Sequence, residues 1–194
     1  MKNKIFLGIF TMLFLVSTSS VFARTPTFPN NAKYTRGVSK TCYYVDSSAS
    51  SYTTLINSAI NNWVDTGYGW NPIYVTPVSS NYATHMDFYG RNNWSSNVLD
   101  AAMRGHTSYW NTDGSAVAQY ENEKPTYNYF YAEIEMNTSR SDSYTKYAVS
   151  HEIGHAFGLD HHSSTNSIMY PFSSTSSVVN VQKEDHDTIN YLYN

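Results

Sequence analysis

Apolar residues recur at steps of three and four positions after residue 48, which predicts an amphipathic helix from about Ala49 to Asp65. The residues of this apolar stripe are Tyr52, Leu55, Ile56, Ala59, Ile60 and Trp63. Asp46 or Ser47 precedes the segment and suits its N-cap, and Gly67 and Gly69 follow it and favour its end. Both end signals therefore support one helix in the first third of the chain.

Two further helices are predicted in the last third of the chain. One runs from about Ser143 to Phe157, with Ser141 or Asp142 as its N-cap, and the other runs from about Lys183 to Tyr193. Between them, Ser173 to Ser177 is a polar, serine-rich loop of low complexity. The chain shows no internal repeat and no sign of a second domain.

Segments rich in Tyr, Val, Ile and Thr, broken by turn residues, predict one strand before the first helix and four between the first and second helices. They are Val38 to Val45, Ile73 to Val78, Tyr82 to Tyr89, about Ala101 to Trp110, and Tyr127 to Met136. Arg24 to Lys33 contains two prolines and has no periodicity, so it is expected to be an extended leader. This leader is either a very short propeptide in a cleft or a disordered arm.

The first 23 residues have the pattern of a secretory signal peptide. Lys2 and Lys4 provide a basic start, Ile5 to Val16 form a short apolar run, and Val21 to Ala23 resemble a cleavage site. The apolar run is shorter than the ~20 residues that a spanning helix needs. We therefore predict cleavage after Ala23 and a secreted, extracellular protein with a leader at 24–33 and one domain at 34–194.

Composition limits the partners of the mature chain. Loss of Lys2 and Lys4 changes the formal charge from −3 to −5, and no lysine- or arginine-rich run remains, so nucleic acid is not expected as a partner. No other apolar stretch is long enough for a bilayer, so no stable membrane association is expected after cleavage. Cys42 is the sole cysteine, which excludes an intramolecular disulfide, and its strand-like surroundings predict a buried, inert thiol.

The most informative chemistry lies in the eleven residues HEIGHAFGLDH. On a helix, His151 and His155 lie one turn apart on one face, and two imidazoles at that spacing can hold one Zn²⁺ ion. Glu152 can then reach a metal-bound water as a general base. Gly158 suits the helix C-terminus and a sharp turn that brings His161 round as third ligand. An open fourth position predicts one catalytic zinc.

The complete HExxHxxGxxH pattern is the metzincin signature, and Met169 in SIMYP resembles that group's Met-turn. Within the metzincins, the stretch HEIGHAFGLDH…HSSTNSIMYP resembles the matrixins. The order of the predicted strands and helices extends this resemblance from about Tyr34 to the C-terminus. His162 is a departure, because matrixins usually place serine directly after the third ligand. Either His161 or His162 can supply the third imidazole in principle, and the spacing favours His161.

This resemblance implies an α+β, zincin-like fold: a twisted, mostly parallel sheet of about five strands, an N-terminal helix, an active-site helix, the Met-turn and a C-terminal helix. It implies that Gly158 and Met169 support the site, and that Tyr170, Pro171 and the following loop wall a substrate pocket. Asp185 matches an acidic residue that braces the Met-turn, or is a solvated carboxylate at a helix start. The strand Arg104 to Trp110 matches the edge where substrate pairs as an added strand.

Animal matrixins also carry a second, structural zinc and calcium ions. The residues available here do not reproduce that zinc loop, so no second zinc is predicted; they are His85, Asp87, His106 and Asp113. Calcium is left undecided, because oxygen ligands have no reliable spacing outside known loops.

The predicted function is that of a secreted zinc endopeptidase acting on protein or peptide substrates as a monomer. An exopeptidase would need a group that captures a chain terminus, and no such group is evident. The alternative is a non-proteolytic binding or adhesion protein on a metzincin scaffold, which would be expected to have lost Glu152 or a ligand. A surface rich in the chain's 18 tyrosines would suit adhesion or glycan binding.

Overall fold

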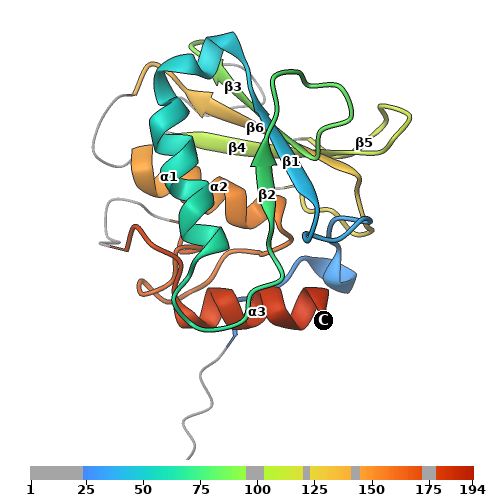
Figure 1. Ribbon diagram of the computed structural model, residues 1–194, viewed down its shortest axis with the longest axis vertical. Coiled ribbons are helices and arrows are strands. Elements are labelled where there is room, and N and C mark those ends of the chain that lie inside the picture. Colours follow the sequence, from blue (N-terminus) through green and yellow to red (C-terminus); the bar gives the residue numbers. More distant parts are fainter. Residues whose placement is uncertain (1–23, 95–102, 120–122, 141–144, 172–177) are drawn as a thin grey trace, which may run out of the picture.

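A mixed sheet of six strands forms the centre of the computed structural model, which describes residues 24–94, 103–119, 123–140, 145–171 and 178–194 (Figure 1). The strands are β1 (Thr41–Val45), β2 (Val75–Pro77), β3 (Met86–Arg91), β4 (Gly105–Trp110), β5 (Ala116–Ala118) and β6 (Tyr131–Asn137), in the spatial order β2-β1-β3-β6-β4-β5. Neighbours from β2 to β6 run parallel, whereas β4 is antiparallel to both β6 and β5. The mostly parallel sheet is confirmed, with β5 as an additional strand.

In the described residues, three α-helices accompany the sheet: α1 (Thr53–Val64), α2 (Thr145–Ala156) and α3 (Lys183–Tyr193). Two short 3₁₀ helices, η1 (Pro29–Asn31) and η2 (Ser47–Tyr52), precede α1. The Asp46 carboxylate accepts the backbone N–H of Ser48 at 2.8 Å, so the expected cap is present. The predicted first helix therefore begins as the serine-rich 3₁₀ segment and continues as α1.

One face of the sheet is covered by α1 and α2, and α3 lies across the end of the molecule shown at the bottom of Figure 1. The fully buried Trp63 of α1 joins the two helices, because its indole N–H donates to the carbonyl of Ser150 in α2 at 2.9 Å. Strand side chains alternate, so Phe88 and Ile134 are buried in the core. Their neighbours Asp87 and Glu133 point to the opposite face.

The segment expected as a leader is packed against the domain. The side chains of Thr25, Phe28 and Ala32 are all buried. Phe28 N–H donates to Gly158 O at 3.2 Å, and Asp160 N–H donates to Pro26 O at 2.8 Å, so the segment runs beside the loop that follows α2. The interpretation of residues 24–33 as a disordered arm is therefore wrong. The buried residues of this segment are irregularly spaced, so they form no periodic pattern that the sequence could reveal.

Several predicted strands begin later than expected. Residues 127–130 lie outside β6, although Tyr129 forms an isolated bridge with Tyr34. Residues 82–85 likewise precede β3. The predicted signal peptide, the caps Ser141 and Asp142, and the loop at 173–177 lie outside the described residues. Among the described helices, none is long and apolar enough to cross a membrane.

Candidate metal centre

The helix α2 and the turn that follows it position three histidines. His151 and His155 lie one turn apart near the end of α2. At Gly158 the backbone takes φ +98°, and its N–H donates to His155 O at 2.8 Å. A side chain at this position would be strained, and its Cβ would lie 2.9 Å from Ala32 O. This turn ends the helix and carries the chain back to His161, as the sequence predicts.

The three imidazoles converge on one point. One ring nitrogen from each of His151, His155 and His161 lies within 4.8 Å of the others, and the group is placed to hold a metal ion. The Nε2 atoms of His155 and His161 are 3.2 Å apart. Within the described part of the chain, no other group of three potential ligands meets this test, and His85, Asp87, His106 and Asp113 do not form one.

Hydrogen bonds orient the first two rings for metal binding. Nδ1 of His151 lies 2.8 Å from Ile168 O, and Nδ1 of His155 lies 2.8 Å from Leu159 O. A carbonyl oxygen only accepts, so each Nδ1 carries the hydrogen and each Nε2 keeps its lone pair. Burial, and then the nearby His161, lower the pKa of His151 to about 3, and burial also lowers the pKa of His155. Both rings are therefore neutral, which is the state that binds Zn²⁺.

The side chain of Glu152, the residue after His151 on α2, is buried and held from strand β4. The Thr107 hydroxyl donates to its Oε2 atom at 2.7 Å. Gly105 leaves room for it, because a Cβ there would lie 2.6 Å from Glu152 Cγ. Burial raises the pKa of Glu152 to about 7, against the opposing effect of the Thr107 hydrogen bond. Thr107 and Gly105 are absent from the sequence prediction, although a glycine inside a strand can mark such a close approach.

Met169 packs beneath α2 in a fully buried turn. Gly154 permits this approach, since a Cβ at Gly154 would lie 2.3 Å from Met169 Sδ and 2.8 Å from Trp63 Cζ2. Met169 N–H donates to the Ser167 hydroxyl at 2.9 Å, which tightens the turn. The position under the histidine-bearing helix is the one expected for a Met-turn.

Asp185 holds this turn from the start of α3. Its side chain has an exposed fraction of 0%, so the alternative of a solvated carboxylate is wrong. It accepts hydrogen bonds from Ser167 Oγ at 2.7 Å and Ile168 N at 3.2 Å. It also accepts from Thr25 Oγ1 at 2.6 Å and Gln182 N at 3.0 Å. One carboxylate thus joins the Met169 turn, α3 and the N-terminal segment.

The structure also describes the other residues that the sequence analysis singled out. His162 is outside it, because its Nδ1 accepts the N–H of Ser164 at 2.8 Å. Tyr170 is half-buried and Pro171 is exposed directly after the Met169 turn. The Cys42 thiol is half-buried, so its predicted burial is incomplete; its Sγ lies 3.4 Å from His85 Nδ1.

Two histidines on a helix, a third after a glycine turn and a buried methionine beneath them define the metal site of a metzincin. The family model described as Matrixin matches residues 46–194, and the chain belongs to the matrixin family. No curated protein sequence matches the chain. Membership makes it a metalloprotease, and the family implies a catalytic zinc that the histidine group is placed to bind.

Proposed function

We propose that the protein is a secreted zinc endopeptidase that hydrolyses internal peptide bonds, with one zinc held by His151, His155 and His161. The observation that carries this proposal is the convergence of three ring nitrogens within 4.8 Å. Glu152, which directly follows His151 on α2, is buried. Secretion rests on the signal-peptide pattern of residues 1–23, which an export assay tests. No observation favours a non-proteolytic binding or adhesion protein.

Glu152 acts as the general base in the proposed mechanism. A bound zinc ion would supply Lewis acidity, activating a water molecule and polarising the scissile carbonyl. Thr107 holds Oε2 of the carboxylate, which leaves Oε1 to accept the proton of the attacking water. Glu152 then delivers this proton to the leaving amine. The pKa near 7 that burial produces suits a group that both accepts and returns a proton.

The edge of β4 that has no strand partner at Gly105–Ser108 among the described residues is the proposed binding site for the substrate backbone. Asn137 N–H donates to Arg104 O, and the antiparallel ladder alternates, so the backbone groups of Gly105 and Thr107 face away from β6. The neighbouring β5 pairs with β4 only at Tyr109 and Trp110. An extended peptide is therefore expected to add as a strand at Gly105–Ser108. We propose that Tyr170 and Pro171 wall the pocket beyond the scissile bond.

Removal of the metal tests the function directly. We expect about one zinc per chain in the purified protein. Cleavage of an internally quenched peptide blocked at both ends should stop on chelation and return when zinc is restored. Magnesium should not restore it, because the neutral imidazoles suit zinc better than a hard cation. Cleavage that continues without bound metal would contradict the proposal; calcium dependence can be measured in the same assay.

Adjacent histidines provide a matched test of the ligand set. His161→Ala should lower the zinc content well below one per chain, because it removes one of three converging nitrogens. His162→Ala should keep the zinc, because that ring only accepts the N–H of Ser164 in the loop. Zinc analysis after dialysis separates the two variants. A reversed result would mean that His162 is the third ligand.

Gly105→Ala should lower kcat by about a hundredfold, since misplacing a catalytic group by about 1 Å has an effect of that size. The new methyl group would meet Glu152 Cγ and push the carboxylate from its place beside the histidines. Ser108→Ala is the control, because the strand alternation directs residue 108 to the opposite face. Both variants should retain zinc, and an unchanged kcat for Gly105→Ala would show that the carboxylate position is not critical.

A further inference from the structure

His161 is held in a different way from the other two histidines of the metal group. His151 and His155 are each oriented by a backbone carbonyl that lies 2.8 Å from Nδ1. Among the residues that the structure describes, no carbonyl accepts from the His161 ring, and His161 is also the most exposed of the three. The position of the third ring therefore depends on the backbone that carries it.

The side chain of Asp160 fixes this backbone. Its Oδ1 accepts the N–H of His161 at 2.7 Å, and the N–H of Asp160 itself donates to Pro26 O at 2.8 Å. The second carboxylate oxygen, Oδ2, accepts from Lys124 Nζ at 2.6 Å as an ion pair. Hydrogen bonds between charged groups are stronger than neutral ones. One carboxylate thus connects the third histidine to a lysine 36 residues earlier than Asp160.

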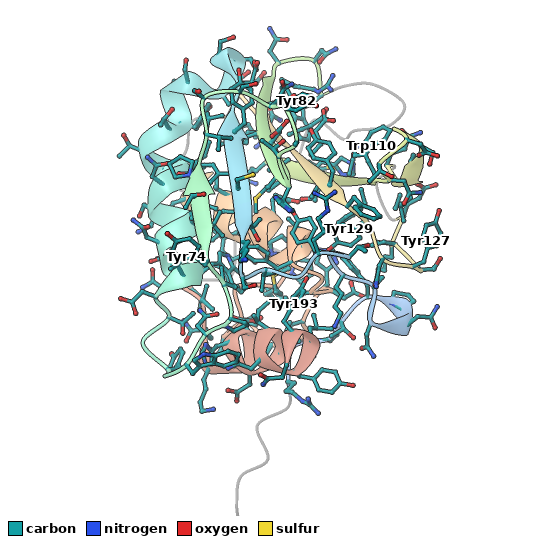
Figure 2. The ribbon with its side chains drawn as sticks, turned by 45° about the vertical axis from the view of Figure 1, so that its right-hand side comes forward. Tyr74, Tyr82, Trp110, Tyr127, Tyr129 and Tyr193 are labelled. Atoms are coloured by element: carbon teal, nitrogen blue, oxygen red, sulfur yellow. The ribbon has the colours of Figure 1, made fainter. Side chains whose placement is uncertain are left out.

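The chain around Lys124 is anchored by other contacts. Pro125 is buried and follows Lys124 directly, which disfavours a helical backbone at the lysine. The Asn30 side-chain amide of η1 donates to Thr126 O at 3.0 Å. Tyr127 accordingly lies next to η1 at the edge of the molecule (Figure 2). The backbone that carries the ammonium group is therefore fixed independently of the ion pair.

A second ion pair in the chain shows what is particular to this one. Lys183 and Asp187 on α3 lie at the same distance, 2.6 Å, but the Asp187 side chain is 33% exposed and that of Asp160 only 15%. A pair between exposed side chains on a helix contributes little. A group that holds a metal ligand from behind has more effect, since removing such a partner typically weakens metal binding by about 10–100-fold.

We infer that Asp160 and Lys124 are positioning residues for the third zinc ligand. The ion pair holds the carboxylate, and the carboxylate holds the backbone of His161. This inference rests on the proposed function, in which His161 binds the zinc. It extends the site beyond the HExxHxxGxxH pattern, because Lys124 belongs to the connection between β5 and β6.

The affinity of the full chain for zinc ion, measured by competition with a chromophoric chelator, tests the inference. Asp160→Ala should weaken zinc binding by about tenfold, because the N–H of His161 loses its acceptor. Lys124→Ala should weaken it by about threefold, because the carboxylate remains but is no longer held. Lys124→Arg should restore the affinity, since a guanidinium group also pairs with a carboxylate.

Two further measurements separate positioning from a general effect on folding. The double variant Lys124→Ala/Asp160→Ala should bind zinc as Asp160→Ala does, because the lysine acts through the carboxylate. Raising the salt concentration to about 1 M, where the Debye length is about 3 Å, should weaken zinc binding by the unmodified chain about twofold more than binding by Lys124→Ala. Urea unfolding of each zinc-free variant checks that it is folded.

Lys183→Ala is the matched control, because it breaks an ion pair of the same length on α3, and it should bind zinc as the unmodified chain does. The inference is overturned if Lys124→Ala binds zinc as tightly as Lys183→Ala, if Lys124→Arg does not restore the affinity, or if the two losses add in the double variant. Loss of zinc in His161→Ala together with normal binding by Lys124→Ala would overturn the role of the ion pair alone and leave the proposed function in place.

Discussion

Glu152→Ala is expected to abolish peptide-bond cleavage while leaving about one zinc per chain. The carboxylate is the group proposed to accept the proton of the attacking water, and positioned general bases contribute about a hundredfold to ten-thousandfold to such reactions. The zinc should remain because the three converging imidazoles do not depend on this side chain. The loss should therefore appear in kcat, with metal content unchanged.

The measurement is kcat and KM on an internally quenched peptide blocked at both ends, with zinc content determined on the same samples. Glu152→Gln is a second variant, because it keeps the size of the side chain and removes the base. Glu184→Gln, on α3, is the control and should cleave normally. Equal cleavage by Glu152→Ala and the unmodified chain would contradict the proposed mechanism. If the unmodified chain and all variants bind zinc but none cleaves the peptide, the protein would be latent or a binding protein.

The histidine group could be predicted from the sequence because its information is local. His151, Glu152, His155 and His161 fall within eleven residues, and helix periodicity with one glycine turn is enough to bring the three rings together. The tautomers could not be predicted, because they depend on carbonyl groups of the loops that follow. The side chain of Ile168, for example, says nothing about the direction of its carbonyl group.

The features of the fold and site that could not be predicted depend on contacts between residues far apart in the sequence. Thr107 reaches Glu152 across 45 residues, and Thr25 reaches Asp185 across 160 residues, so neither pair leaves a pattern at short range. The segment after Arg24 buries Phe28 and Ala32 without a repeat, which made it resemble a free leader.

Asp185→Ala is expected to lower the free energy of unfolding by about 3–5 kcal/mol, the largest stability effect among these predictions. The fully buried carboxylate accepts four hydrogen bonds, from Thr25, Ser167, Ile168 and Gln182. Alanine would leave these donors buried without an acceptor, and each unsatisfied buried group is unfavourable by about 1–3 kcal/mol, although the effects are not additive. Urea unfolding of the zinc-free protein measures the change without the added stability of bound metal.

Asp187→Ala is a matched control two residues further along α3. Its carboxylate is partly exposed and pairs with Lys183 at 2.6 Å as an i,i+4 ion pair, which contributes about 0.3–0.5 kcal/mol. Asp185→Ala should also reduce cleavage and zinc affinity, because Ser167 and Ile168 link it to the carbonyl that orients His151. Equal unfolding free energies for the two variants would contradict this account: the Met169 turn would then hold its shape without the carboxylate, and His151 would be oriented by helix α2 alone.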